Sequence, residues 1–376
     1  MDDTRSIPAD SALPGWLATL PQGWQPYAML ARWDRPVGIW LLYLPCLIGL
    51  SFQRLITGVY VFDLAWVVLF LIGAIAMRGA GCTWNDISDR DFDASVSRTA
   101  LRPLPSGAVS TKQAYVFLAA QLLVGFVIWL VLPLDAKLVA LLSVPMVIAY
   151  PYMKRITWWP QAWLGLTFNW GVLVGAAVAS QISLSVIVLY AGLILWTIAY
   201  DTIYALQDRE DDALIGVRST ARLFGKRAVL ISFCFHLGAS ALIALAATMN
   251  DAGRIGAVTA LLFLAHGIWQ AARLKSSRER DALSVFKSNV WAGALVAIGF
   301  TVSAMAPEPT PKSLFADHEI VPDGPPSRVS LPFGFEVRHS QPSAADPGET
   351  WFASAALRAL KREGVIGPDD AEPVPE

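Results

Sequence analysis

Two short acidic segments place several carboxylates within a few helical turns of one another. NDISDRDFD occupies residues 85–93, and YDTIYALQDREDD occupies residues 200–212. On an α-helix, residues three, four or eight positions apart lie close to one face. The oxygen-bearing side chains that fit this spacing are Asn85, Asp86, Asp89 and Asp93 in the first segment and Asp201, Tyr204, Asp208 and Asp212 in the second, with Asp211 beside them. Each segment is therefore predicted to direct several oxygen atoms toward one side.

Carboxylates this close together repel one another and stay ionised only when positive charge compensates them. Neither segment contains His or Cys, which argues against zinc, whereas a site built from oxygen atoms suits Mg²⁺. Mg²⁺ commonly binds one or two carboxylates together with phosphate oxygens of a substrate. Two such segments predict a metal-bridged diphosphate held between them. The simpler interpretation, solvated acids in loops, accounts less well for the same spacing occurring twice.

Basic residues accompany the acidic segments and could bind the diphosphate. Arginine matches phosphate oxygens with a two-pronged donor group. The candidates are Arg98 and Arg102 in SRTALRPLPSG, Lys154 and Arg155 in YPYMKR, and Arg32 and Arg35 in ARWDRPVG. Membrane topology also places Lys and Arg in connections on one side, so both interpretations stay open for each residue.

The composition indicates an integral membrane protein. Of the 376 residues, 55% are hydrophobic and only 16% are charged, against about 25% charged in soluble domains. The net charge of −1 combines +5 over residues 1–305 with −6 over residues 306–376, which gives no sign of nucleic-acid binding. The three cysteines lie in apolar surroundings without metal-binding spacing, and the N-terminus lacks the pattern of a signal peptide.

Nine apolar runs are long enough to cross a bilayer, which takes about 20 residues. They are predicted to be helices, because a backbone in lipid must satisfy its own hydrogen bonds. The predicted spans are 37–57, 62–82, 113–132, 136–153, 161–180, 184–206, 227–249, 254–274 and 285–305.

Lys and Arg gather in alternate connections, which predicts how the spans are oriented. By the positive-inside rule, both acidic segments face the cytoplasm of a bacterial-type inner membrane, and the C-terminal tail lies on the opposite side. The predicted organisation is an N-terminal segment (1–27), a membrane domain (28–305) and a Pro-rich acidic tail (306–376). The tail is predicted to be disordered, with one short amphipathic helix within 349–365.

The motifs resemble those of the UbiA family of membrane prenyltransferases, and within it the enzymes that prenylate 4-hydroxybenzoate in ubiquinone biosynthesis. RGAGCTWNDISDRDFDASVSRTALRPLPSGAVS is similar to the family's first signature, and AYDTIYALQDREDDALIGVRSTARLFG to its second. YPYMKR and PQAWLG match a further block between them. The resemblance covers about residues 28–305, with one departure at Ser97, where related sequences often carry Lys or Arg.

The resemblance implies an all-α bundle of nine transmembrane helices around a central cavity, capped by the connections that carry the acidic motifs. It implies Mg²⁺, a polyprenyl diphosphate donor, a 4-hydroxybenzoate acceptor and transfer to the ring carbon ortho to the hydroxyl. The implied metal and diphosphate residues are Asn85, Asp86, Asp89 and Asp93 from the first motif and Asp201, Asp208 and Asp212 from the second, and Arg155 matches a diphosphate-contacting arginine.

The catalytic roles within this scheme stay open. Asp208 or Asp201 could assist removal of the phenol proton, and Tyr204 lies on the same stripe. The acceptor could be another aromatic compound, such as homogentisate or a naphthoate. A transporter is less compatible, because transporter acids lie near the bilayer midplane and these lie at the ends of spans. The D-G-x-x-A-R signature of CDP-alcohol phosphotransferases is absent.

Overall fold

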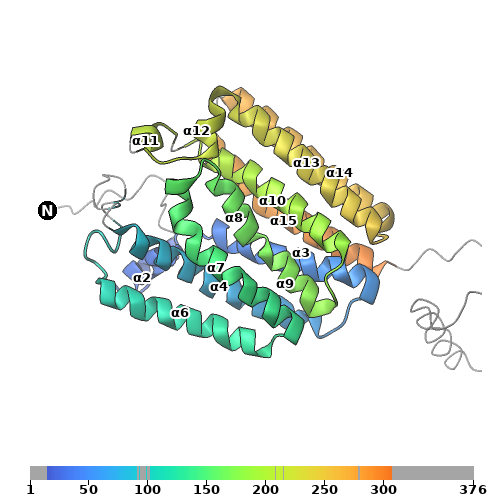
Figure 1. Cartoon of the computed structure of the whole chain (residues 1–376), viewed down its shortest axis with the longest axis horizontal. Helices are drawn as coiled ribbons and strands as arrows, with labels where there is room; N and C mark the ends of the chain where they lie inside the picture. Colours follow the sequence, from blue (N-terminus) through green and yellow to red (C-terminus); the bar gives the residue numbers. More distant parts are fainter. Residues whose placement is uncertain are drawn as a thin grey trace, which may run out of the picture. The chain divides into compact units, whose positions relative to one another are not determined.

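The computed structural model describes residues 15–90, 93, 99, 102–207, 209–214, 216–277 and 280–306. All regular elements in these residues are helices, which confirms the predicted fold class (Figure 1). They are α1 (Gly15–Ala18), α2 (Gln25–Leu30), α3 (Val37–Thr57), α4 (Asp63–Ser88), α6 (Thr111–Val131), α7 (Leu134–Ile156), α8 (Pro160–Phe168), α9 (Trp170–Ala179), α10 (Leu184–Tyr204), α11 (Arg209–Leu214), α12 (Thr220–Phe224), the 3₁₀ turn η1 (Gly225–Arg227), α13 (Ala228–Met249), α14 (Gly253–Ser277) and α15 (Ala282–Met305). Predictions for residues 1–14 and for the tail after 306 lie outside the described residues.

Nine candidate membrane spans occur in the described part of the chain, each at a predicted position. The second span is longer than predicted, because α4 continues to Ser88 and carries Asn85 and Asp86 inside the helix. The fifth span is divided into α8 and α9 at Asn169. The buried Asn169 amide donates to Thr197 Oγ1 at 2.7 Å and to the Leu193 carbonyl at 3.0 Å, so a polar contact with α10 accompanies the break.

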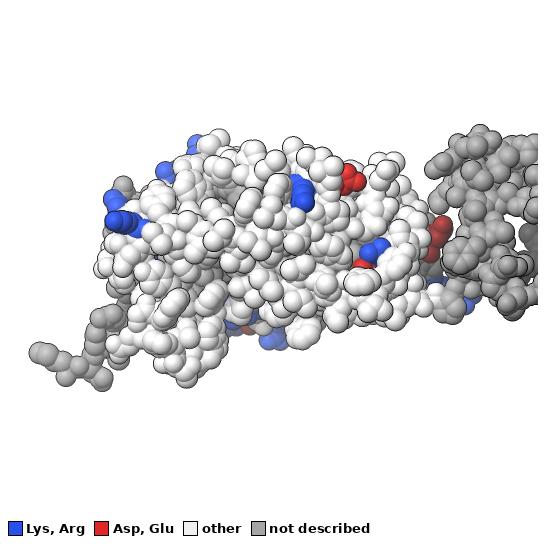
Figure 2. All heavy atoms as spheres, turned by 90° about the horizontal axis from the view of Figure 1, so that it is seen from below, with Lys and Arg blue, Asp and Glu red and all other residues white. Residues whose placement is uncertain are grey.

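The nine spans differ in how deeply they are buried. α3 packs against α4, α9 and α15 near the centre of the bundle (Figure 1). Two-thirds of its span window is buried (67%), whereas only 11% of the window in α7 is, so α7 presents most of its apolar surface outward. The face drawn in Figure 2 is almost free of charge, and Lys and Arg side chains gather toward the end near α11. This distribution is the one that a bundle embedded in lipid requires.

The contact of α3 with α9 depends on glycine. A Cβ on Gly49 would collide with the backbone of Val172, and a Cβ on Gly175 would collide with the backbone of Cys46. The two helices therefore approach closely, as small residues allow in membrane bundles. This contact fixes one wall of the cavity described below.

The connections that carry acidic and basic residues meet at one end of the bundle. Arg32, just before α3, contacts Asp86 at the end of α4, with 2.7 Å between Nη2 and Oδ1. The connection after α11 reaches the end of α7, because Arg218 N donates to the Lys154 carbonyl at 3.2 Å. At the opposite end of α4, Asp63 pairs with Arg54 of α3. We call the first end, with Asp86, Asp89, Asp93, Arg102 and Lys154, the acidic end.

Candidate active site

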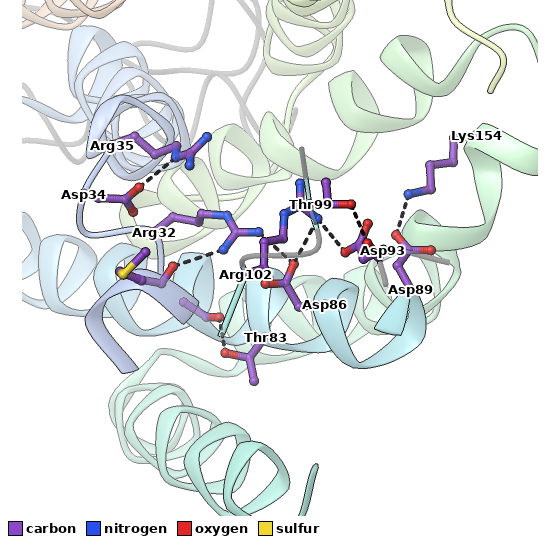
Figure 3. A network of polar contacts seen from close by, with 12 residues as sticks. Arg32, Asp34, Arg35, Thr83, Asp86, Asp89, Asp93, Thr99, Arg102 and Lys154 are labelled. Atoms are coloured by element: carbon purple, nitrogen blue, oxygen red, sulfur yellow. Dashed lines mark hydrogen bonds and ion pairs between the residues drawn. The ribbon is translucent and has the colours of Figure 1, made fainter. Parts of the chain in front are cut away.

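The first acidic segment lies at the end of α4, where the helix emerges from the apolar bundle. Asn85 and Asp86 lie in its last turn, and Asp89 is the C-cap residue. Asp89 N donates to the Asn85 carbonyl at 2.9 Å, and Asp93 N donates to the Asp89 carbonyl at 2.7 Å. The backbone thus keeps the predicted helical spacing past the end of α4, and three carboxylates follow one another along it (Figure 3).

Asp89 pairs with both basic residues predicted at the end of α7. Its Oδ1 accepts from Arg155 Nη2 at 2.6 Å, and its Oδ2 accepts from Lys154 Nζ. The Asp89 side chain is 1% exposed, so these cations compensate a carboxylate that burial would otherwise destabilise. Lys154 and Arg155 are about 65 residues from Asp89 in sequence, and the fold brings them into contact.

Arg102 joins the other two carboxylates of the segment. Its Nη1 lies 2.6 Å from Asp93 Oδ2 and 3.7 Å from Asp86 Oδ1 (Figure 3). Thr99 Oγ1 donates to the Asp93 carbonyl at 2.8 Å and holds this turn in place. Burial raises the pKa of the Asp93 carboxyl, while the nearby Arg102 guanidinium opposes that shift. Arg98, the neighbouring candidate, lies outside the described residues.

Asp86 is the residue of this segment that has room for a further partner. It is fully buried, and only its Oδ1 is engaged, by Arg32 and at longer range by Arg102. Its Oδ2 is buried without a hydrogen-bond partner among the described residues. A buried carboxylate oxygen without a partner is costly, which indicates that another group completes its environment.

The oxygen atoms of Asn85 and Asp86 fit Mg²⁺ better than they fit a metal ion that needs three or more protein side chains as ligands. No group of three or more His, Cys, Asp or Glu side chains placed to hold a metal is found within the described part of the chain, which omits Asp208 and the side chains of Asp211 and Asp212. Mg²⁺ needs only one or two carboxylates when phosphate oxygens and water supply the rest. The unpartnered oxygen of Asp86 and the adjacent Asn85 amide provide hard oxygen ligands of that kind.

The second acidic segment differs from its prediction. One continuous helical stripe was expected for Asp201, Tyr204, Asp208 and Asp212, but α10 ends at Tyr204 and α11 begins at Arg209. Leu206 N bonds to the Ile203 carbonyl and Gln207 N to the Tyr204 carbonyl, which are the short-range bonds of a tightening helix end. Asp208 and the side chain of Asp212 lie outside the description.

Asp201 and Tyr204 take different environments within the last turn of α10. Asp201 interacts electrostatically with Arg78 of α4 and Tyr150 of α7. The ring of Tyr204 packs against Phe286 of α15, with 4.5 Å between centroids. The structure therefore places Asp201 toward α4 and α7, and it places the Tyr204 ring against α15.

A cavity of about 600 Å³ extends from the acidic end into the bundle. Helices α3, α4, α6, α7, α8 and α9 form its walls, and its α4 lining runs from Leu69 to Asn85, about 24 Å at 1.5 Å per residue. Its polar end is lined by Arg32, Arg78, Asn85 and Tyr150, and its far end by apolar side chains such as Phe70, Trp129 and Leu132. The arrangement suits a ligand with a charged head and a long hydrocarbon chain.

Arg78 is a candidate functional residue that motif spacing did not identify. Its guanidinium lies over the ring of Phe168 at 5.3 Å, and a Cβ on Gly38 would collide with Arg78 Nε. Arg78 Nε is buried without a hydrogen-bond partner among the described residues. An arginine inside a membrane span is itself a signal of function, and this one had been included in an apolar run.

Comparison with known proteins agrees with this geometry. The model of the "UbiA prenyltransferase family" matches residues 42–301. The chain is 42% identical to the mitochondrial 4-hydroxybenzoate polyprenyltransferase of Mus musculus over 306 residues, which covers 79% of each chain. It is 38% identical to 4-hydroxybenzoate geranyltransferase 2 of Lithospermum erythrorhizon over 301 residues, or 78% of this chain and 96% of that enzyme.

Solved structures show the same fold. An apo UbiA homolog from Aeropyrum pernix K1 aligns with a TM-score of 0.60 at 27% identity, covering 70% of this chain and 97% of that one. A UbiA homolog from Archaeoglobus fulgidus bound to GPP and Mg²⁺ aligns with a TM-score of 0.57 at 18% identity, covering 75% of this chain and all of that one.

The predicted location is corrected by the relatives. A bacterial-type inner membrane, with the acidic end in the cytoplasm, was expected from the Lys and Arg distribution. The relatives from mouse, cattle, Arabidopsis thaliana and human are all named as mitochondrial proteins, which contradicts that location. Charge counting orders the two ends of a bundle, but it carries no information about which membrane holds the protein.

Proposed function

The chain belongs to the UbiA prenyltransferase family, and on this basis we propose that it transfers a polyprenyl group from an all-trans polyprenyl diphosphate to 4-hydroxybenzoate. The prenyl group joins the ring carbon ortho to the hydroxyl, and diphosphate is released, as a membrane step of ubiquinone biosynthesis. The names of the relatives support the acceptor and the reaction class. The observation that carries the proposal is the apolar cavity whose polar end is lined by Asn85, next to the buried Asp86, and by Arg32, which pairs with Asp86.

The carboxylates of the first segment are proposed to hold Mg²⁺. Asp86 offers its buried unpartnered oxygen, Asn85 its amide, and Asp89 and Asp93 their carboxylates when their cations turn to the donor. Asp208 and Asp212 remain predicted ligands from the second segment. Bound there, Mg²⁺ would supply neutralisation of the charge that develops on the leaving diphosphate. The archaeal homolog with GPP and Mg²⁺ supports the fold alone at its low identity, so the metal assignment depends on this chain's own oxygen atoms.

The basic residues of the acidic end are proposed to bind the diphosphate. Arg102 contacts Asp93, and Lys154 and Arg155 contact Asp89, so these carboxylates hold the three cations at the acidic end. When the donor binds, each cation can exchange a carboxylate oxygen for a phosphate oxygen without leaving a charge unpaired. Arg98 remains a fourth candidate. This exchange stabilises negative charge at the atoms where it develops.

Arg78 is proposed to bind the carboxylate of the acceptor. It lines the cavity seven residues before Asn85, so the two are about 10 Å apart along α4 and lie on one face. Its unpartnered Nε can donate to an anion, and the Phe168 ring supports the guanidinium from below. A hydroxybenzoate held there by its carboxylate would direct its phenol end toward the diphosphate.

The bond changes follow from this placement. The allylic carbon–oxygen bond breaks, and its electron pair leaves on the diphosphate. The electron-rich ring carbon ortho to the hydroxyl then bonds to the cation-like carbon, and the proton on that ring carbon is lost. Asp201 and Asp208 remain the candidate bases for the phenol proton, and Asp201 is the one of the two whose surroundings are described, near Arg78 and Tyr150. Tyr204 remains a predicted site residue, and its ring packs on Phe286.

The apolar part of the cavity protects the reacting carbon and holds the tail. Its far walls bear Phe70, Trp129 and Leu132, which offer hydrocarbon and aromatic surface and exclude water from a carbocation. A relative that acts with a geranyl donor by its name is about as similar as those named polyprenyltransferases. Donor length is therefore a variable for experiment. For location, a mitochondrial membrane is the proposal that the names of the relatives support.

Activity of the purified protein tests this proposal. The protein, in detergent with Mg²⁺, is given polyprenyl diphosphates of several lengths and a panel containing 4-hydroxybenzoate, homogentisate and a naphthoate. The expected product gains a prenyl group ortho to the hydroxyl of 4-hydroxybenzoate, with an equal amount of diphosphate released. Preference for another panel member would replace the acceptor, and the absence of any prenylated product would reject the function.

A further inference from the structure

Gly81 leaves an open gap in the α4 wall of the cavity. It lies one helical turn before Asn85 and lines the cavity with it. A Cβ at Gly81 would have no neighbouring atom within 4 Å among the described residues. The missing side chain therefore adds free space to the cavity itself, rather than room for another helix.

The other glycines of α4 show that this gap is unusual. A Cβ on Gly79 would collide with the Gln121 side chain of α6, so Gly79 serves helix packing. A Cβ on Gly73 would lie 3.6 Å from Ile128 Cδ1, which is ordinary van der Waals contact. Gly in a helix interior has a stability cost relative to Ala, because its backbone loses more conformational freedom on folding. Helix packing does not account for that cost at Gly81, whereas space for a ligand does.

The position of the gap identifies the part of the ligand that it faces. Arg78, Gly81 and Asn85 follow the 3.6-residue repeat and form one stripe along the cavity face of α4. Gly81 thus lies between a guanidinium with an unpartnered Nε and the residue next to Asp86, whose Oδ2 is also unpartnered. The prenyl chain has to run away from the diphosphate into the apolar end, near Phe70 and Trp129. Because Arg78 is the proposed partner of the acceptor carboxylate and the phenol end points toward the diphosphate, the ring of the acceptor lies along α4 between the two polar anchors.

From this placement we infer that Gly81 is a specificity-determining residue for the acceptor: the ring of the hydroxybenzoate lies against the bare backbone of α4 at this position. The inference rests on the proposed function. A flat ring can approach a helix closely only where no Cβ stands in the way, so the width of the acceptor is limited at residue 81. Gly73, about 12 Å farther along α4 on the apolar side, faces the prenyl chain instead.

Matched substitutions at the two glycines test the inference. Gly81→Ala, Gly81→Leu, Gly73→Ala and Gly73→Leu all remove a glycine from the same helix, so changes in helix propensity are shared. Initial rates are measured against 4-hydroxybenzoate at saturating donor and against donors of several lengths at saturating acceptor. Thermal unfolding of each variant reports folding. Gly81→Ala keeps the test valid if the leucine variant does not fold.

The expected result is a rise in the KM for 4-hydroxybenzoate at residue 81, modest for Ala and roughly tenfold to hundredfold for Leu, the range for crowding in a binding pocket. Donor KM stays unchanged in these variants, whereas Gly73→Leu changes the preference for donor length and leaves acceptor KM unchanged. A changed donor preference at Gly81 with unchanged acceptor KM would overturn the inference, and so would the absence of any effect. Failure of the wild-type protein to prenylate 4-hydroxybenzoate would reject the proposed function, and this inference with it.

Discussion

The two ends of α4 each carry a buried aspartate paired with an arginine, and they differ in how completely the carboxylate is satisfied. At the start of the helix, Asp63 accepts from Arg54 Nε at 2.9 Å, from Arg54 Nη2 at 2.6 Å and from Tyr60 N at 2.9 Å. At the other end, Asp86 engages Arg32 through Oδ1 only, and its Oδ2 has no partner among the described residues. Both oxygens of Asp63 therefore accept hydrogen bonds within the protein, whereas Asp86 Oδ2 accepts none from the described residues.

The difference separates a structural ion pair from a ligand site on the same helix. Arg54 and Asp63 form a two-pronged pair that joins α3 to α4, and the remaining Arg54 Nη1 donates to Thr57 Oγ1 at 2.9 Å. Near Asp86, the cations Arg32, Arg102, Lys154 and Arg155 surround three carboxylates next to a cavity. Such a group is costly to bury unless a ligand uses it. The comparison predicts that the acidic end controls activity and that the other end controls stability.

Removal of the metal is expected to have the largest effect on activity, and it should leave the stability of the protein almost unchanged. Chelation with EDTA should abolish product formation, and added Mg²⁺ should restore it, because the proposed role of the carboxylates near Asp86 is to hold the metal that would neutralise the diphosphate. Product is measured by chromatography and unfolding by a thermal melt. Full activity after exhaustive chelation would reject a metal role at the acidic end.

Asp86→Asn is expected to cause the second-largest loss of activity. The variant keeps the shape of the side chain but removes the charge, so kcat/KM should fall by about 10³-fold, as when a group that stabilises transition-state charge is lost. Steady-state kinetics measure the loss, and a melt near that of wild type excludes misfolding. Asp89→Asn is expected to behave in the same direction. Near wild-type rates in both variants would show that these carboxylates are not needed for the reaction and only mark one end of the membrane spans.

Asp63→Asn is the matched change at the other end. Breaking a buried ion pair leaves Arg54 without its partner and should lower the free energy of unfolding by about 3 kcal/mol. Activity at a temperature where the variant is folded should stay at the wild-type level. A loss of turnover without a loss of stability would contradict the division between the two ends.

Arg78→Lys has the smallest expected effect among these changes. Lysine keeps the positive charge but not the planar guanidinium, so the KM for 4-hydroxybenzoate should rise about tenfold while donor KM is unchanged. Arg280→Lys, at an exposed position in the connection before α15, is a control for a surface arginine. An increase in donor KM alone would assign Arg78 to the diphosphate.

Much of the fold could be predicted from the sequence, because length and apolarity determine a membrane span locally. All nine predicted spans are confirmed, and their ends shift by a few residues. The break at Asn169 could not be predicted, since it involves a hydrogen bond to Thr197, a contact between distant helices. The stripe from Asp201 to Asp212 failed because one shared helix was assumed, whereas α10 ends at Tyr204, a turn follows at Ala205 to Gln207, and α11 begins at Arg209.

The residues that form the site could largely be predicted from the sequence, whereas the ion pairs between them could not. Motif spacing identified Asp86, Asp89 and Asp93. Arg102 is only nine residues from Asp93, but Arg32 and Arg155 are 54 and 66 residues from Asp86 and Asp89, and these two pairings were not predicted. Arg78 was missed because a single charge inside an apolar run barely changes hydropathy. Arg98 and Asp208 remain predictions, as they lie outside the described residues.

The most direct measurement is binding of a non-reactive donor analogue, a geranyl thiolodiphosphate, by calorimetry with and without Mg²⁺. Wild type and Asp63→Asn should bind it only when Mg²⁺ is present, and Asp86→Asn should lose that binding. Equal binding by Asp86→Asn, or binding by wild type that does not depend on Mg²⁺, would contradict the assignment of the acidic end as the metal–diphosphate site.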